Sequence, residues 1–157
     1  MKQKWSFFGF ILGVLVGSGL VVIFVLSRPP IPLVSTSVVE VVFSPLIERI
    51  NQERSQAGVV PLVGLRHLHQ GALIRAALVS AGEWSHAGYE ASLSAVTQAK
   101  TGKIGENLAR GYTTEDAVVV AWLASPTHAS VMLNSKFRYA GVGRVGTHWV
   151  LWLTENP

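Results

Sequence analysis

The chain has 157 residues, of which 49% are hydrophobic and 14% are charged, so it is long enough for one globular domain and an additional segment. It has no cysteine, which excludes disulfide bonds, thiol nucleophiles and thiolate metal sites. The net charge is +4, but three of these charges lie within residues 1–28, and the remainder of the chain carries only +1. This balance excludes the basic surface typical of nucleic-acid binding, so we expect no nucleic-acid partner.

The N-terminal segment is apolar enough to cross a membrane. Residues 5–26 contain no charged residue over 22 positions. As a helix they would be about 33 Å long, against about 30 Å for the hydrocarbon core of a bilayer. Lys2 and Lys4 precede this run and only Arg28 follows it closely, which predicts a single-pass helix with its N-terminus in the cytoplasm. We therefore expect a membrane anchor over residues 1–28.

A cleaved secretory signal peptide is the alternative interpretation of this segment. Its apolar core would be long, and small residues lie either inside the core, at 17–19, or well beyond it, at 35–37. Cleavage would release a secreted protein, whereas retention would leave the protein in the cell membrane. Both interpretations place the rest of the chain outside the cytoplasm.

A proline-rich linker over residues 29–43 is expected to join this segment to a folded domain over residues 44–157. Ser44 and Pro45 form a cap-and-proline pair that is typical of a helix start. Apolar residues at helical spacing follow, with charged residues on the opposite face, and Gly58 ends the pattern.

The pattern predicts further helices and a final hairpin. Residues 66–82 have an apolar face at helical spacing, residues 89–99 show a weaker helical pattern, and Thr114 caps the helix that follows it. Two apolar segments around Gly146 predict a C-terminal β-hairpin. Because helices come first and strands last, we expect an α+β fold with helices packed on an antiparallel sheet.

Residues 121–134, AWLASPTHASVMLN, contain a second cap-and-proline pair. Ser125 is expected to accept a hydrogen bond from a free backbone N–H, and Pro126 suits the first position of a helix. His128 then falls in the first turn of the new helix, where helix capping does not explain it.

Several stretches form a recognisable series: LIERINQERSQAGVVPL (46–62), WSHAG (84–88), GENLARG (105–111), AWLASPTHASVML (121–133) and FRYAGVG (137–143). In order and spacing they resemble the CAP superfamily of cysteine-rich secretory, antigen 5 and pathogenesis-related 1 proteins. The likeness is greatest to its cysteine-free bacterial branch of SCP-domain proteins. The resemblance implies an α–β–α sandwich with a cleft where two histidines and up to two glutamates converge.

Position by position, the resemblance places His86, Glu106 and His128 in this cleft. The second glutamate of the eukaryotic members would stand at Ser125, so the group is reduced to three, and Asn107 is expected to brace a loop beside it. Two imidazoles and a carboxylate fit Zn²⁺ or a similar divalent ion, with positions open to water or ligand. Two alternatives stay open: Glu106 fixes the tautomer of a histidine, or the group only ties helices together.

The other histidines and the tryptophans have simpler interpretations. His67 and His69 stand two residues apart and do not share a helical face, so we expect them at the surface. Trp84, Trp122 and Trp149 are expected in the core or in the wall of the cleft.

The resemblance favours a binding module over an enzyme. It implies a membrane-tethered extracytoplasmic CAP domain whose cleft holds a small-molecule or lipid-like ligand, with a divalent metal as an option. A cell-envelope hydrolase and a scaffold for another protein are the alternatives. The sequence contains no Gly-x-Ser-x-Gly elbow and no His-Glu-x-x-His zinc helix, so no hydrolase motif supports the enzyme. The sequence specifies neither the ligand nor a protein partner.

Overall fold

The computed structural model describes residues 12–16, 19–23, 39–94 and 103–157, and the chain divides into two compact units, Met1–Ser37 and Val38–Pro157. In the first unit, β1 (Leu12–Val16) pairs antiparallel with β2 (Gly19–Ile23). These strands lie where a helix over residues 5–26 was predicted. Both are rich in valine and glycine, and valine favours strands whereas glycine disfavours helices. No helix within the described ranges combines the length and apolarity needed to span a bilayer.

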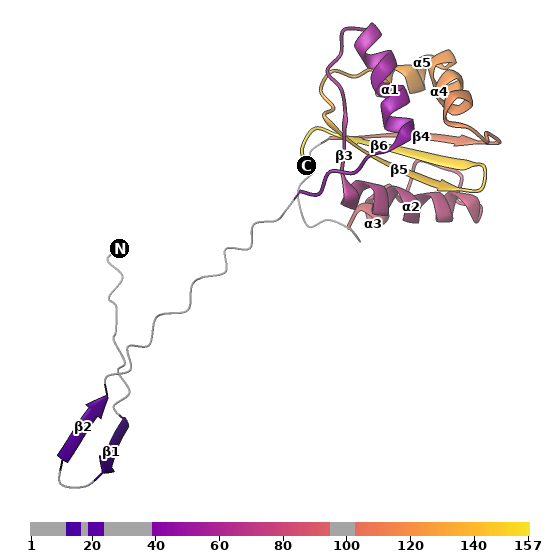
Figure 1. Cartoon of the computed structure of the whole chain (residues 1–157). Helices are drawn as coiled ribbons and strands as arrows, with labels where there is room; N and C mark the ends of the chain where they lie inside the picture. The colour runs from indigo at the N-terminus through magenta and orange to yellow at the C-terminus, as the bar shows by residue number, and fades with distance from the viewer. Residues whose placement is uncertain (1–11, 17–18, 24–38, 95–102) are drawn as a thin grey trace. The chain divides into compact units, whose positions relative to one another are not determined.

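The second unit contains a four-stranded sheet in the order β3-β5-β6-β4 (Figure 1). Its strands are β3 (Val63–Gly64), β4 (Ile104–Arg110), β5 (Tyr139–Val145) and β6 (His148–Thr154). β5 and β6 form the predicted C-terminal hairpin, and β6 also pairs antiparallel with β4. β3 runs parallel to β5, so the sheet is mixed and not antiparallel throughout as predicted. A parallel pair is possible here because a long crossover that includes α2 separates the two strands.

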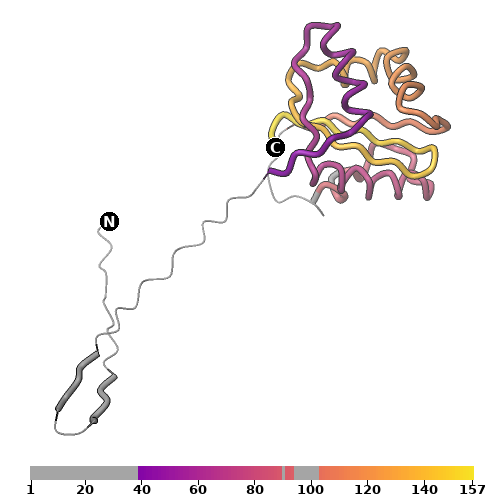
Figure 2. The backbone as a smooth tube through the Cα atoms, viewed as in Figure 1, coloured from indigo at the N-terminus to yellow at the C-terminus, as the bar shows by residue number. Residues whose placement is uncertain are grey.

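Helices cover both faces of this sheet, as Figures 1 and 2 show. On one face lie α2 (Arg66–Ser80) and α3 (Tyr89–Ser94), and on the other lie α1 (Pro45–Gln56), α4 (Glu115–Ala124) and α5 (Pro126–Met132). The three layers agree with the sandwich that the resemblance implied. The part of the third predicted helix beyond residue 94 lies outside the described residues.

Local chemistry explains where the helices begin. The Ser44 hydroxyl accepts from the Ile47 N–H at the start of α1, and the Thr114 hydroxyl accepts from the Ala117 N–H at the start of α4, which confirms both predicted caps. Ser125 precedes α5 as predicted, but its hydroxyl caps no backbone N–H. It lies 2.9 Å from the Nδ1 of His128 instead, because the imidazole in the first turn offers a closer partner.

Helix α2 packs directly against the backbone of β5. A Cβ atom on Gly141 would overlap the backbone of Leu68, and one on Gly143 would overlap the backbone of Ala72. Only glycine permits this approach, which explains the two glycines in this strand. The close packing sets the height of α2 above the sheet, so that Arg75 on α2 contacts Glu106 on β4.

Arg54 departs from the predicted amphipathic pattern of α1, because it is fully buried. Its guanidinium donates hydrogen bonds to four backbone carbonyl oxygens, those of Val60, Met132, Asn134 and Phe137, at 2.7–3.1 Å. The side chain therefore joins α1 to the segment between α5 and β5. Burial lowers the pKa of Arg54, and the nearby charge of Arg138 adds to this effect.

Candidate functional site

The candidate site lies along β4, an edge strand of the sheet. The Gly111 N–H, directly after β4, donates to the Thr147 carbonyl directly before β6. By alternation, the backbone groups of Leu108 and Arg110 then face the open edge. The indole N–H of Trp122 donates to the Leu108 carbonyl from that side, at 3.1 Å. The open edge of β4 is thus partly covered by a side chain of α4.

A cavity of about 260 Å³, which we call the β4 groove, lies beside this edge. It is lined by Trp84, Leu108, Ala109, Arg110, Tyr112, Ala121, Trp122, Ser125 and His128. Trp84, which follows α2, contributes from one side of the sheet, and α4 and the start of α5 contribute from the other. The groove therefore joins segments that are far apart in the sequence and includes two of the predicted site residues, Ser125 and His128.

Glu106 is held by three donors in a buried position, with only 4% of its side chain exposed. Its Oε1 accepts from the Nδ1 of His86 at 3.0 Å, and its Oε2 accepts from the indole of Trp152 at 2.8 Å and from the Nε of Arg75 at 3.2 Å. Arg75 is also fully buried and donates to the Ser85 carbonyl, which ties the segment that carries His86 to α2.

The Glu106 contact determines which nitrogen of His86 is free. A carboxylate accepts hydrogen bonds, so Nδ1 is the donor, and Nε2 carries the lone pair of the neutral ring. The His86 side chain is 62% exposed, so this lone pair is accessible to a ligand. Glu106 thus acts on His86 as the tautomer-fixing group that the sequence left open as an alternative.

His128 stands on the opposite side of β4 from Glu106. Its Nδ1 lies 2.9 Å from the Ser125 hydroxyl, and its backbone carbonyl accepts from the Nδ2 of the buried Asn107 at 3.0 Å. Burial lowers the pKa of His128, and a positive charge on His86, when that ring is protonated, lowers it further. His128 is therefore neutral at pH 7, and it is near enough to His86 for the two rings to interact electrostatically.

The donor set fits a metal ion only through the two histidines. The carboxylate of Glu106 is only 4% exposed and already accepts three hydrogen bonds, so little of it is open to direct coordination. Within the residues that the structure describes, no three His, Asp or Glu side chains are grouped as a metal site. A metal ion bound here would use the Nε2 atoms of His86 and His128, together with water or ligand atoms, and Zn²⁺ binding stays a prediction.

Two residues of this site, Arg75 and Trp152, were not predicted from the sequence. Arg75 had a detectable signal, because it stands on the apolar stripe of α2 together with Leu68, Ala72 and Val79, all of which are buried. A charged residue on such a stripe predicts a buried partner of opposite charge. Trp152 had no such signal, since its indole is one of several aromatic groups in a strand that is buried on both faces.

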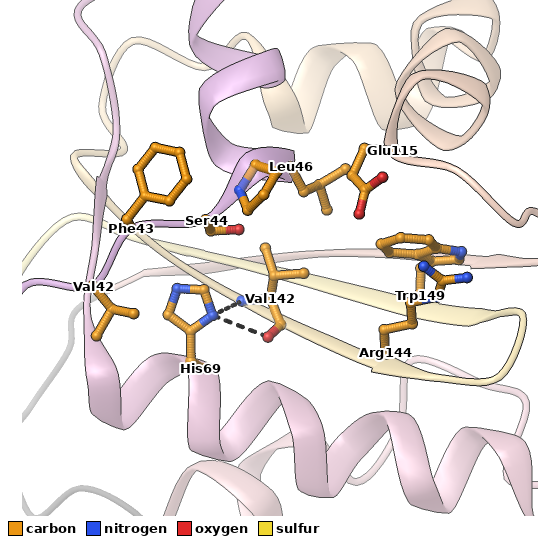
Figure 3. Close-up of a pocket in the computed structure, with 10 residues that line it drawn as sticks. Val42, Phe43, Ser44, Leu46, His69, Glu115, Val142, Arg144 and Trp149 are labelled. Carbon is orange, nitrogen blue, oxygen red and sulfur yellow. Dashed lines mark hydrogen bonds between the residues drawn. The ribbon is translucent and has the colours of Figure 1, made fainter.

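A second cavity, of about 330 Å³, lies between the start of α1 and β5 and contains His69 (Figure 3). The His69 ring is 3.1 Å from both the backbone N and the backbone O of Val142, and its Nε2 is buried without a partner. The prediction of a surface position is wrong for His69. β3 ends after two residues, and the ring covers the β5 edge that a longer strand would occupy. None of the residues predicted for the functional site lines this cavity.

The comparison with family models decides the identity of the fold. The model of CAP, the cysteine-rich secretory protein family, matches residues 47–150, which include His86, Glu106 and His128. The chain belongs to the CAP family. A search of curated proteins finds no match.

Three solved structures resemble this CAP domain. An extracellular SCP-domain protein of Bacillus anthracis is 20% identical, with a TM-score of 0.66 over 71% of this chain and 39% of that one. A cysteine-rich secretory protein of Staphylococcus aureus is 22% identical, with a TM-score of 0.61 over 71% and 37%. An outer surface protein of Borrelia burgdorferi is 18% identical, with a TM-score of 0.63 over 76% and 99%. The CAP chain thus spans less than half of the first two proteins. Because all three identities are below 25%, the likeness establishes a shared fold alone.

Proposed function

We propose that this CAP protein is a binding module on the outer side of the cell membrane, and that its β4 groove holds a small or lipid-like ligand together with a divalent metal ion such as Zn²⁺. The observation that carries the proposal is the hydrogen bond from His86 to Glu106. It leaves an exposed imidazole lone pair near the groove, across β4 from a second imidazole that is neutral at pH 7. Two neutral imidazoles are typical ligands of Zn²⁺.

The proposed location has two supports. The described relatives include an extracellular protein and an outer surface protein of bacteria. The uncharged run over residues 5–26, with its preceding lysines, is typical of a segment that inserts in a membrane. We propose that this segment tethers the protein, and that its cleavage would instead release the CAP domain as a secreted protein.

A cell-envelope hydrolase is the second candidate, and the Ser125–His128 contact favours it. A hydroxyl 2.9 Å from an imidazole has the spacing of a nucleophile and its base. The pair lacks an orienting acid, however, because the nearby Glu106 is occupied by Arg75, Trp152 and His86. A binding role accounts for the same residues without this missing group, and loss of ester turnover in Ser125→Ala would favour the hydrolase.

The test is a calorimetric titration of Zn²⁺ into the full 157-residue chain. We expect micromolar binding that falls at least about tenfold in His86→Ala and in His128→Ala, since each removes one imidazole ligand. His67→Ala serves as the matched control, because it removes an imidazole that lines a different cavity, together with Arg66 and Gln70. Absence of binding in the wild type, or equal binding in all three variants, would contradict the metal site and favour a purely structural role for the His–Glu group.

A further inference from the structure

We propose that the ligand of the β4 groove carries a carboxylate group, which Arg110 binds while the apolar part of the ligand lies against Trp84. This inference rests on the proposed function, since it specifies the chemistry of the molecule that the groove holds. It assigns a role to Arg110 that the family resemblance does not, because the motif comparison carried over only the His–Glu group.

Arg110 differs from the other arginines in the described part of the chain. It is exposed at the end of β4, and it makes neither a hydrogen bond nor an ion pair there. The others all donate to a carboxylate or to backbone carbonyls; they are Arg49, Arg54, Arg66, Arg75, Arg138 and Arg144. The five N–H groups of Arg110 are therefore available, and a guanidinium with free donors fits a carboxylate in two parallel hydrogen bonds.

The guanidinium of Arg110 is nevertheless held in place. Its central carbon lies 4.9 Å from the centre of the Trp84 ring, in the range of a cation–π contact. Trp84 is itself positioned by an edge contact with His148, whose ring centre is 6.2 Å away. This support reduces the conformational entropy that Arg110 would lose on binding a ligand, which favours a functional donor over a freely moving surface charge.

The charge of the groove is complementary to an anion. Among the described residues that line it none is acidic, and Arg110 is the only permanently charged one. The nearby carboxylate of Glu106 is buried against Arg75, so it does not offset the charge of Arg110. An anionic ligand would thus meet a positive group without repulsion from the lining.

The groove also offers an apolar surface beside this charge. Trp84 is 41% exposed, although a tryptophan of a folded domain is normally well buried. Leu108, Tyr112 and Ala121 continue the lining toward α4. A volume of about 260 Å³ suits a short alkyl chain or one aromatic side chain, so the expected ligand is a carboxylic acid with an apolar body.

Such a carboxylate has two plausible sources, an acyl chain and the C-terminus of a peptide, and matched probes separate them. Octanoate and octanamide form the first pair, and N-acetyl-alanyl-phenylalanine and its amide form the second. Each is titrated into the ¹⁵N-labelled full chain, and the indole N–H signals of the tryptophans are followed. Trp84 and Trp122 line the groove, whereas Trp149 does not and serves as an internal reference.

We expect at least one of the two acids to shift the Trp84 signal, and its amide to bind at least about tenfold more weakly. Arg110→Gln should lower the affinity for the acid at least about tenfold and abolish the preference over the amide. Arg110→Lys should have an intermediate affinity for the acid, because it keeps the charge and loses the planar guanidinium group. Lys136→Gln, which removes an exposed charge outside the groove, should bind like the wild type.

Three results would overturn the inference: equal binding of acid and amide, unchanged affinity in Arg110→Gln, or no shift with either acid at millimolar concentration. Equal binding of acid and amide at Trp84 would leave the groove as a ligand site. If neither acid binds, the Zn²⁺ titration shows whether the proposed function fails as well. Metal binding without any effect of the acids would preserve the proposed function and reject the carboxylate, and failure of both would reject the two together.

Discussion

Glu106 shows how one buried side chain can be a brace and part of a site at the same time. Its three donors come from α2, β6 and the segment after α2, so it connects the α2 layer and the neighbouring strand β6 to β4. The same contacts select the tautomer of His86 and expose its lone pair. From the sequence, a structural role and a role in ligand binding were alternatives for Glu106, whereas its geometry is compatible with both.

The partly buried histidines lead to a prediction about stability in acid. Burial lowers the pKa of His67, His69 and His128, so the unfolded chain binds more protons than the folded one as the pH falls through about 6.5. The free energy of unfolding should therefore be highest above this pH and decrease below it, by at most about 1.4 kcal/mol per pH unit for each histidine. Urea unfolding between about pH 7.5 and pH 5 measures this slope.

His69→Gln should reduce the slope, since the variant has no imidazole to protonate in the unfolded chain. Lys136→Gln, which changes an exposed charge without touching a histidine, should leave the slope unchanged. The hydrogen bond with the backbone of Val142 partly raises the pKa of His69, so we expect a moderate change in the slope. A His69→Gln variant with the slope of the wild type would refute the role of His69.

At the scale of elements, the helices and strands that were predicted correctly are those that the local sequence specifies. Ser44-Pro45 and Thr114 mark helix starts through their own caps, and the C-terminal hairpin has a turn glycine between two apolar runs. β4 was not predicted, because its sequence, IGENLAR, places Glu106 and Asn107 at buried positions. Their partners, Trp152, Arg75 and the His128 carbonyl, come from distant segments, so no local pattern shows that these polar residues are satisfied in a strand.

The candidate site was predicted in part. The resemblance located His86, Glu106 and His128, and the structure places the first two in contact and the third across β4. It did not locate Arg75 or Arg110, whose roles depend on the spacing between α2 and the sheet and on the position of Trp84. These distances are properties of the packed molecule.

The α2–β5 contact predicts the effect of adding one methyl group. Gly143→Ala would force a Cβ into the backbone of Ala72, and the helix would have to move away from the sheet. Overpacking of this kind typically costs about 1–3 kcal/mol, and we expect the upper part of that range because the obstacle is backbone. Urea unfolding measures the loss.

Gln70→Ala, at an exposed position of the same helix, should change the stability by less than about 0.5 kcal/mol. The displaced helix should also disturb Arg75 and thus the Glu106 contacts, visible as a shift of the Trp152 indole signal. A Gly143→Ala variant as stable as Gln70→Ala would show that α2 can shift without cost.

At the scale of the whole molecule, Arg54 joins segments that are about half of the chain apart. It bonds the carbonyls of Met132, Asn134 and Phe137, which lie 78 to 83 residues further along. Arg54→Met would keep the apolar stem and leave these buried acceptors without donors. We expect a loss of about 3 kcal/mol or more in the free energy of unfolding, measured by urea denaturation.

Arg54→Lys should recover only part of the loss, since one ammonium cannot reach four carbonyls that the planar group contacts together. Arg49→Met is the matched control on the same helix. Arg49 forms ion pairs with Glu53 and with the well-exposed Asp116, and surface pairs of this kind contribute at most about 1 kcal/mol each. Equal losses in Arg54→Met and Arg49→Met would contradict the structural role of Arg54.

The Arg54 link has a consequence for a domain that contains no cysteine. It connects distant segments as a disulfide would, but it needs no oxidant to form and no reductant opens it. Unlike a covalent bond, it leaves the unfolded chain unconstrained, so its whole effect lies in the native state and returns each time the chain refolds. The fold of this CAP domain is therefore independent of the redox conditions on either side of a membrane.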